Sequence, residues 1–414
     1  MKLDVGDILQ IPVTRLALGG DSIGTLPDGR VCFVRGAPIT EKCQVRLIKV
    51  KKRFVRGELL TRIESPHCGS ASKCGGCPWH FAEAEIQNQS LLQHAIRSLS
   101  RLQWQHEVHD IAWGALSEKE GWRRTIRWRW EGKQLGLLKW GTHQIVDALS
   151  CSILMPTLES VRLQLREAFR KSGVGTGVLK ASLGADNQVY LSAQLDDQLE
   201  LNEAQVRSFL EFLVREIDDL GGVECTHDAR VIFEWGAHTY PVGADQVPHH
   251  ISGFVQANAS IHDDFVTYVT EQFPQGSHVL ELFCGAGIFT HRLLQRGCSV
   301  VAIEGSRTAC ATLSKSAESW ISDGALTVRN ERIGAMPKGE GDYCLLDPPR
   351  AGIKTLLSHL KPNQFQRIVY VACDFGTLCR DLEGLNRIGY RIEAARLFDM
   401  FPNSGHVECV VTLV

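Results

Sequence analysis

The sequence predicts an α/β protein in which a C-terminal Rossmann-like domain follows a small β-barrel and an α+β central domain. Three observations support this fold class. From about residue 255, apolar strands alternate with helical segments, which is typical of a doubly wound parallel sheet. Residues 1–62 hold short alternating segments separated by turn signals such as GGD and PDGR. Between these regions, three cysteines lie close together in PHCGSASKCGGCPWHF.

The length and composition are those of a protein with more than one core. The chain has 414 residues, 44% of them hydrophobic, and we expect domains at residues 1–62, 63–254 and 255–414. No apolar run reaches the roughly 20 residues that span a bilayer. The N-terminus, MKLDVGDILQIPV, lacks the basic and apolar regions of a secretory signal. We therefore expect a soluble, cytoplasmic protein without membrane contact.

The N-terminal region is basic, although the whole chain has a net charge of −2. Residues 1–64 contain 12 Lys and Arg against 7 Asp and Glu. Short strands in about 60 residues suggest a small barrel of the oligonucleotide-binding kind, and the asymmetry indicates a module that binds a polyanion such as RNA. A solvated, charged edge strand explains the stretch IKVKKRFVRGELLTRI equally well.

The central region contains a second basic segment, GWRRTIRWRW, at residues 121–130. Its arginines alternate with Trp122, Trp128 and Trp130, which suits phosphate contacts and base stacking. A half-buried strand with one charged face gives the same alternation. Around it, helical patterns run from the cysteine cluster to about residue 101 and cover residues 157–172 and 201–220, with a hairpin in KASLGADNQVYLSAQL.

The C-terminal region begins with a glycine turn between a strand and a helix, in VLELFCGAGIFTHRLLQRG. Gly285 and Gly287 let the backbone approach a ligand, and the helix N-terminus adds N–H donors. The next strand ends at Glu304, where a carboxylate can hold ribose hydroxyls. Thr290 replaces the third glycine of the dinucleotide fingerprint, which favours S-adenosylmethionine over a nicotinamide cofactor.

Further strands are expected at residues 278–283, 298–304, 325–330, 342–347, 367–373, 390–398 and 406–414. Carboxyl ends of parallel strands line the ligand crevice, so Asp347 in LLDPPRAG and Cys373 in VYVACDF should lie beside the glycine turn. Taken alone, Cys373 is expected to be an ordinary buried cysteine, but its position beside the glycine turn and Asp347 favours a nucleophile. Glu408, inside an apolar strand, is either a surface residue of an edge strand or a buried proton acceptor. Arg350 stands where adenine N6 methyltransferases have an aromatic residue.

The spacing Cys68-x5-Cys74-x2-Cys77 indicates a metal site in a protein expected to be reduced. A fourth thiolate is needed, and Cys151 is the candidate. A zinc ion and a [4Fe–4S] cluster both bind four thiolates, and spacing alone does not separate them.

Together, the motifs CGGCPWHF, GFVQAN, ELFCGAGIFT, LDPPRAG, VAC…TLCRDL and DMFPNSGHVE resemble the RNA 5-methyluridine methyltransferase family. The resemblance covers essentially the whole chain. It is with the branch that has a TRAM domain and an iron–sulfur central domain, laid out like the bacterial enzymes for uridine 1939 of 23S rRNA. It implies an S-adenosylmethionine methyltransferase domain at residues 255–414, and RNA as partner of a monomeric enzyme.

The resemblance also implies roles for individual residues. Cys373 would be the nucleophile that adds to uracil C6, Glu408 the base that removes the C5 proton, and Asp347 a contact to the pyrimidine or cofactor. Two further sets are implied: S-adenosylmethionine contacts from Gln256, Phe283, Glu304, Asn330 and Asp347, and a [4Fe–4S] cluster on Cys68, Cys74, Cys77 and Cys151.

Two departures from the family pattern stand out. Cys373-Asp374-Phe375 replaces Cys-Asn-Pro, and Ile288 stands where Asn is common. Three alternatives to a 23S rRNA enzyme remain open at this stage. They are a tRNA uridine-54 methyltransferase, an RNA-binding protein that has lost catalysis, and an iron–sulfur oxidoreductase with a Rossmann domain. The oxidoreductase does not explain Asp347-Pro348-Pro349 followed by Cys373 and Glu408.

Overall fold

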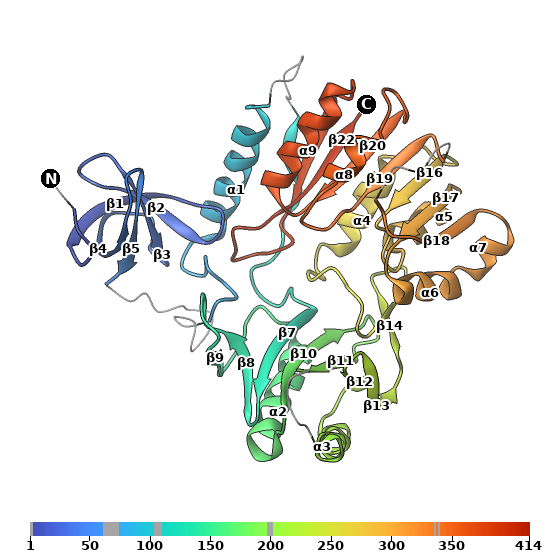
Figure 1. Ribbon diagram of the computed structural model, residues 1–414, viewed down its shortest axis with the longest axis horizontal. Helices are drawn as coiled ribbons and strands as arrows, with labels where there is room; N and C mark the ends of the chain where they lie inside the picture. Colours follow the sequence, from blue (N-terminus) through green and yellow to red (C-terminus); the bar gives the residue numbers. More distant parts are fainter. Residues whose placement is uncertain (1–2, 61–73, 103–109, 197–201, 335–336, 338–339) are drawn as a thin grey trace.

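The structure is a computed structural model that describes residues 3–60, 74–102, 110–196, 202–334, 337 and 340–414. Figure 1 shows a small barrel at the left in blue, a sheet with two helices below it in teal and green, and a larger α/β region at the upper right. Within the described residues, no helix has both the length and the apolar character needed to cross a membrane.

The N-terminal region folds as a closed barrel, in the strand order β1-β2-β3-β5-β4. Its strands are β1 (Ile8–Leu16), β2 (Asp21–Thr25), β3 (Val31–Arg35), β4 (Thr40–Val50) and β5 (Phe54–Leu59). Buried and exposed residues alternate along β4, because inward positions fill the barrel and outward positions face water. Closure leaves no edge strand, so the exposed Lys49, Lys51, Lys52 and Arg53 are not edge protection.

The central region is a sheet of seven strands in the order β13-β12-β11-β10-β7-β8-β9. Its strands are β7 (Thr125–Glu131), β8 (Gln134–Leu138), β9 (Ile145–Val146), β10 (Thr176–Leu183), β11 (Val189–Leu195), β12 (Leu220–His227) and β13 (Arg230–Gly236). Helices α2 (Pro156–Ser172) and α3 (Glu203–Glu216) pack apolar stripes against it. The predicted hairpin is β10–β11, and a separate hairpin joins β14 (Thr239–Val242) and β15 (Val247–His250).

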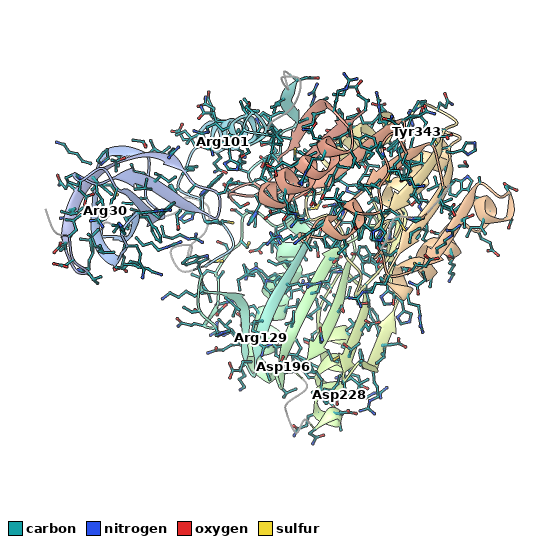
Figure 2. The ribbon with its side chains drawn as sticks, turned by 45° about the horizontal axis from the view of Figure 1, so that its top comes forward. Arg30, Arg101, Arg129, Asp196, Asp228 and Tyr343 are labelled. Carbon is teal, nitrogen blue, oxygen red and sulfur yellow. The ribbon has the colours of Figure 1, made fainter. Side chains whose placement is uncertain are left out.

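The interpretation of GWRRTIRWRW as a base-stacking surface is wrong for its aromatic residues. Trp122, Trp128 and Trp130 are 2%, 2% and 4% exposed, so they lie inside the protein. Strand β7 lies within the sheet and points one face into the core, which produces the alternation. On the other face, Arg129 forms an ion pair with Asp196 of the segment after β11, and both are labelled in Figure 2.

The C-terminal sheet has eight strands in the order β18-β17-β16-β19-β20-β22-β21-β6. Its strands are β16 (His278–Leu282), β17 (Ser299–Glu304), β18 (Leu326–Asn330), β19 (Tyr343–Leu346), β20 (Arg367–Ala372), β21 (Ile392–Phe398), β22 (Glu408–Leu413) and β6 (Ile111–Ala115). Helices cover both faces of the sheet. Because the central strands are buried on both sides, their sequences are continuous apolar runs. One face carries α1 (Ala84–Leu99), α8 (Lys354–Leu357) and α9 (Phe375–Arg387); the other carries α4 (His262–Glu271), α5 (Ile288–Gln295) and α6 (Arg307–Ser316), and α7 (Glu318–Ser322) follows α6.

We expected a parallel sheet from the sequence, and this prediction is wrong for one strand. Strand β22 runs antiparallel to both β20 and β21. Residues 399–407 connect β21 to β22, which is too short for the crossover that a parallel return needs. Consequently β22 begins, rather than ends, at the edge where the parallel strands end. This direction brings its first residue, Glu408, to that edge.

The segment assigned from sequence to the central domain, residues 63–254, is divided in the structure. Strand β6 pairs in parallel with β21, where Ile111 lies opposite Ala395. Helix α1 buries Leu91, Ala95 and Leu99 in the same core as β20 and α9. Helix α1 therefore packs on the C-terminal sheet and β6 is one of its strands, whereas the seven-stranded sheet begins at Thr125.

Candidate active site and cysteine site

The candidate site lies where the strands of the C-terminal sheet end. Leu282 pairs with Ile303 on one side and Leu346 on the other, and Leu346 pairs with Tyr370. Because these strands are parallel and in register, their carboxyl ends open on one crevice. The residues predicted from sequence to bind and react follow directly: Phe283, Glu304, Asn330, Asp347 and Cys373.

The turn between β16 and α5 has the backbone geometry of a close ligand approach. Phe283, Gly285 and Gly287 all have positive φ, of 65°, 55° and 87°. A Cβ on Gly287 would lie 2.4 Å from Leu313, so this glycine is needed for packing. A Cβ on Gly285 would meet nothing within 4 Å, so its outer side is open. The turn presents backbone to open space at a helix N-terminus, as an anionic or polar ligand requires.

Glu304 is fixed at the end of β17 by the backbone around it. The N–H groups of Gly285 and Ser306 donate to the two carboxylate oxygens at 3.1 and 2.7 Å. The side-chain amide of Asn330 donates to the Glu304 carbonyl oxygen at 3.0 Å, which ties the predicted contacts of β17 and β18 together. Gln256 is buried in the segment between β15 and α4, next to Val255. Val255 belongs to an apolar cluster that contacts Ile288 at the start of α5.

That contact explains one departure from the family pattern. Ile288 packs on an apolar cluster of Tyr190, Tyr240, Val242, Ile251 and Val255. An aliphatic residue therefore joins α5 to the central region, where an Asn would bury a polar group.

Cys373 follows β20 and precedes α9, whose N-terminus favours an anionic sulfur. The residue is partly exposed, unlike the ordinary core cysteines Cys344 and Cys409. Burial and then the charge of Glu408 raise the pKa of the thiol, while the charge of Arg350 and a hydrogen bond from it lower the pKa. The resting thiol is therefore protonated, and Arg350 is the group that favours its thiolate.

Glu408 lies opposite the end of β20. Ala372 pairs with Cys409 in the antiparallel ladder, so Cys373 and Glu408 follow as the next facing residues. Glu408 is 4% exposed and lies inside the sheet, which excludes the interpretation as a surface residue of an edge strand. Burial, reinforced by Asp347, raises the pKa of Glu408 to about 8, and Arg350 opposes this shift. A carboxyl group with such a pKa is suited to accept a proton near neutral pH.

Asp347 lies between the cofactor side and the nucleophile side of the crevice. Desolvation of its carboxyl group and the charge of Glu304 raise the pKa of Asp347 to about 7. Its charge in turn raises the pKa values of Glu408 and Cys373. The structure thus brings together one thiol, two carboxyl groups with raised pKa values, and one guanidinium.

Two residues of this region were not identified from the sequence. Glu281 in β16 is 1% exposed, and burial raises its pKa to about 8 although Thr290 donates a hydrogen bond to it at 2.6 Å. Among the described residues, its second oxygen is one of the buried atoms without a partner. The signal was present in the sequence, because Glu281, like Glu408, is a carboxylate inside an apolar strand. Arg350 was used only to argue against adenine methylation.

A separate site gathers three of the four predicted metal ligands. Cys74 and Cys77 from the turn before α1, and Cys151 from the segment before α2, line one pocket with His80. The Gly76 N–H is directed at the Cys74 sulfur at 3.4 Å, and apolar residues such as Trp128 and Leu135 form the walls. Cys68, the remaining predicted ligand, lies outside the described residues.

Arg123 adds a positive charge to this cysteine site. Burial lowers the pKa of its guanidinium, whereas the charges of Cys77, Cys151 and Cys74 raise it. Convergent sulfurs, an N–H donor and a compensating cation fit a group held by several thiolates. They do not distinguish iron–sulfur from zinc.

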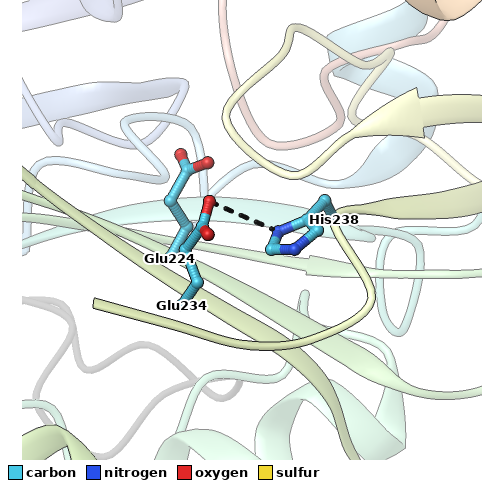
Figure 3. A group of neighbouring side chains, drawn as sticks. All are labelled: Glu224, Glu234 and His238. Carbon is cyan, nitrogen blue, oxygen red and sulfur yellow. Dashed lines mark ion pairs between the residues drawn. The ribbon is translucent and has the colours of Figure 1, made fainter. Parts of the chain in front are cut away.

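One further group on the central sheet could coordinate a cation, and no spacing in the sequence pointed to it. Glu224, Glu234 and His238 offer atoms within 4.8 Å of one another (Figure 3). Glu224 and Glu234 lie directly opposite each other on β12 and β13. His238 is 3.8 Å from Glu234, and His250 is 3.7 Å from Glu224, so both carboxylates already face imidazoles. Glu234 and His238 are exposed, as ordinary surface pairs are.

Comparison with known proteins matches both ends of the chain to families. Residues 338–414 match the tRNA (Uracil-5-)-methyltransferase family, and residues 2–60 match the TRAM domain. The 23S rRNA (uracil(1939)-C(5))-methyltransferase RlmD of Salmonella typhi is 29% identical over 99% of this chain and 97% of its own length. The RlmD protein of Cronobacter sakazakii is 27% identical over 92% of this chain and 90% of its own length.

A solved structure is similar over the whole chain. It is the Pyrococcus abyssi tRNA (uracil-54, C5)-methyltransferase in complex with S-adenosyl-L-homocysteine, with a TM-score of 0.74 and 20% identity. The match covers 98% of this chain and 100% of that one. At this level of identity the likeness establishes the fold alone: the chain shares its α/β architecture with that enzyme, and the N-terminal barrel coincides with the residues that match the TRAM domain.

Proposed function

We propose that this chain, which matches the TRAM domain at its N-terminus and the tRNA (Uracil-5-)-methyltransferase family at its C-terminus, methylates C5 of a uridine in structured RNA. The observation that carries this proposal is the meeting of Cys373 and Glu408 at the ends of β20 and β22, beside Asp347. The RlmD relatives favour 23S rRNA as the substrate class over tRNA, because they are 27% and 29% identical to this chain, whereas the tRNA enzyme of similar coverage is 20% identical.

The reaction explains why these residue types are needed. Uracil C5 is too weak a nucleophile to take a methyl group unaided, and S-adenosylmethionine, when bound, supplies that methyl group as an electrophile. The Cys373 thiolate adds to C6, so that an S–C6 bond forms and the electron pair of the C5–C6 bond makes C5 nucleophilic. After methylation, Glu408 takes the C5 proton, the double bond returns, and the S–C6 bond breaks to release Cys373.

The residues around the crevice divide the remaining tasks. Arg350 favours the thiolate form of Cys373, which is otherwise protonated. Phe283, Gly285, Gly287 and Glu304 would hold the cofactor through the turn backbone and the ribose hydroxyls, together with Gln256 and Asn330. Asp347, whose pKa is raised by the charge of Glu304 and whose own charge raises the pKa of Glu408, would contact the pyrimidine or the cofactor amine.

The cysteine site would hold a [4Fe–4S] cluster through Cys68, Cys74, Cys77 and Cys151. The cluster is structural in this proposal, because neither methyl transfer nor proton removal needs an electron carrier. Support comes from the convergence of three of these sulfurs on one pocket. A colourless protein with one bound zinc would contradict the assignment; an anaerobic preparation that is brown, with about four iron atoms per chain, is expected.

The barrel would hold the RNA backbone while the target base leaves its stack. The exposed Lys49, Lys51, Lys52 and Arg53 at the β4–β5 hairpin supply positive charge for this contact.

A covalent trap tests the proposed function. With RNA that carries 5-fluorouridine, no proton can leave C5, so the enzyme should remain attached through the S–C6 bond. We expect a protein–RNA species that survives denaturant and is lost in Cys373→Ala. Cys379→Ala is the matched control, because Cys379 is another partly buried cysteine of the same region. Failure of every ribosomal and transfer RNA fragment to form the adduct would reject the mechanism.

The same experiment separates the substrates. An adduct with a 23S rRNA fragment but not with tRNA is expected, and the reverse would move the substrate to tRNA. Calorimetric binding of NADH in place of S-adenosylhomocysteine would point instead to an oxidoreductase.

A further inference from the structure

The loop that leads into Glu408, residues 399–407, is held by Gln87 of α1. Gln87 is 1% exposed, and its side-chain oxygen accepts the Asn403 backbone N–H at 3.0 Å. Its nitrogen faces the Asn403 side-chain oxygen at 3.1 Å, the Ala82 carbonyl at 2.8 Å and the Trp79 carbonyl at 3.2 Å. One buried amide therefore joins the loop before Glu408 to the turn after Cys77.

The contact between the loop and this turn has a second, independent part. The Trp79 N–H donates to the Asn403 carbonyl at 3.0 Å, and the Trp79 ring is fully buried. A Cβ on Gly405 would lie 3.1 Å from that ring and 2.8 Å from the Gly19 nitrogen of the barrel. The loop is thus enclosed between the cysteine turn and the β1–β2 turn, and Asn403 itself lines the pocket of Cys74, Cys77 and Cys151.

The start of the loop is held in a comparable way. Asp399 is fully buried, and Lys119 forms an ion pair with it at 2.6 Å. The Asn403 side chain donates to the Lys119 carbonyl at 3.1 Å, and the Asn258 side chain donates to the Asp399 carbonyl at 3.1 Å. Together these residues fix the backbone from which Glu408 follows.

We propose that Gln87 and Asn403 are positioning residues for Glu408, and that they couple the cysteine site to the proton-removal step. The inference rests on the proposed function, since it concerns the step assigned to Glu408. Because Trp79 lies two residues after Cys77, whatever group the thiolates hold fixes the carbonyl and N–H that bind Gln87 and Asn403. A displacement of about 1 Å in a catalytic group can cost about a hundredfold in rate, so a clamp on this loop controls catalysis from outside the crevice.

The first test is Gln87→Met, which keeps the side-chain length and removes every hydrogen bond. With RNA carrying the natural uridine, methyl transfer should proceed while the covalent adduct accumulates at least about tenfold over the original enzyme, because its resolution needs Glu408. The KM for S-adenosylmethionine should stay unchanged. Gln89→Met is the matched control, since Gln89 is exposed on the same helix and its side-chain amide donates to the neighbouring Glu85 at 3.1 Å.

The second readout is the rate at which a chelator removes metal from the protein. Gln87→Met should accelerate release several-fold, because the turn after Cys77 loses two hydrogen-bond donations. In the opposite direction, Cys151→Ser should accumulate the adduct as Gln87→Met does, because it weakens the site that holds the turn after Cys77.

The outcomes separate the inference from the proposed function. If the original enzyme forms no adduct with fluorinated RNA, the proposed function fails. If it forms and resolves the adduct, but Gln87→Met resolves it at the same rate or loses adduct formation and resolution equally, only the inference fails. Should Gln87→Met not fold, Asn403→Gly decides, because Asn403 has φ 63° and glycine adopts it without strain. A wild-type rate of resolution in Asn403→Gly would overturn the clamp.

Discussion

The Oδ1 atom of Asp374 accepts a hydrogen bond from the Thr377 N–H at 2.8 Å, which makes the residue after Cys373 the N-cap of α9. The next residue, Phe375, is 7% exposed, and its ring meets His94 of α1 edge-on at 5.4 Å. Asp374 and Phe375 therefore fix the start of α9 where Cys-Asn-Pro was the expected pattern. With Asp374 and Phe375 in place of Asn and Pro, the Cys373 thiol still lies at the N-terminus of a helix.

Asp374→Ala should remove this cap and lower the free energy of unfolding by about 1 kcal/mol. It should also slow adduct formation with fluorinated RNA, because the thiol would no longer be held against the end of α9. Asp374→Asn, which can cap equally well, should behave like the original protein. Denaturant unfolding and the adduct assay measure the two effects; equal losses in both variants would show that the cap is not the cause.

Arg350→Ala should make Cys373 less reactive. The guanidinium lowers the pKa of the thiol against the opposing effects of burial and Glu408, so its loss leaves less thiolate at any pH near neutrality. Iodoacetamide alkylation of Cys373, with Cys373→Ala as the background, should become several-fold slower at pH 8. Arg350→Lys keeps the positive charge, so its alkylation rate should lie between those of the original protein and Arg350→Ala. An unchanged alkylation rate in Arg350→Ala would show that Arg350 does not influence the Cys373 thiol.

Glu408→Gln should stabilise the protein in a pH-dependent way while abolishing proton removal. The pKa of Glu408 rises from 4.5 to about 8 on burial, so the folded state binds this proton more tightly than the unfolded state. The penalty for burying the carboxylate is absent below about pH 4.5 and complete above about pH 8. The stability gained by the variant should therefore grow across this range, to a few kcal/mol at the top.

Denaturant titrations at pH 5 and pH 8.5 check that expectation. Glu383→Gln, at an exposed position of α9, is the control and should show no such growth. A gain of Glu408→Gln that is the same at both pH values would mean that the carboxyl is not desolvated.

Three glycine substitutions separate packing from ligand binding in the turn after β16. Gly287→Ala places a methyl group 2.4 Å from Leu313 and should destabilise the protein itself. Gly285→Ala meets no atom within 4 Å but faces the crevice, so its main effect should be weaker S-adenosylhomocysteine binding in calorimetry. Gly297, at the end of α5, has a comparable positive φ of 76°, and a Cβ there would meet no atom within 4 Å. Gly297→Ala therefore strains the backbone in the same way without a packing clash. It should cost about 1 kcal/mol and leave binding intact.

Metal removal should loosen the protein locally before it unfolds. Chelation, or Cys151→Ala, should lower the first thermal transition and increase proteolysis within residues 74–82, because the thiolates tie this turn to the segment before α2. Cys379→Ala should keep the metal. Full iron content in Cys151→Ala would exclude this residue as a ligand.

The sequence predicted the strands of the C-terminal sheet well, because central strands with helices on both faces are continuous apolar runs. It also predicted which residues share the crevice, since parallel strands end at one edge. It could not show that β22 reverses direction, which depends on how the 399–407 loop packs. The mistaken stacking role of Trp128 and Trp130 has a simple cause: an arginine–tryptophan alternation looks the same whether the tryptophans face RNA or α2.

The sequence did not show that α1 and β6, within residues 63–254, pack with the C-terminal sheet, because these contacts join segments far apart in the chain. Strand β6 is short and only partly buried, and its partner β21 lies far along the chain. Gln87 gives no signal either, since a glutamine in an amphipathic helix is ordinary until its buried amide is seen to meet Asn403.

The pairing of Ile111 with Ala395 also sets the order in which the protein can be made. On the ribosome, β6 emerges long before β21 exists, so the edge that it completes stays open until nearly the whole chain has been translated. A fragment that begins at residue 255 would lack both β6 and α1 and should expose β21 and the apolar face beneath α1 to aggregation. We therefore do not expect the C-terminal α/β region to fold as a fragment that begins at residue 255; a useful boundary has to lie before residue 84.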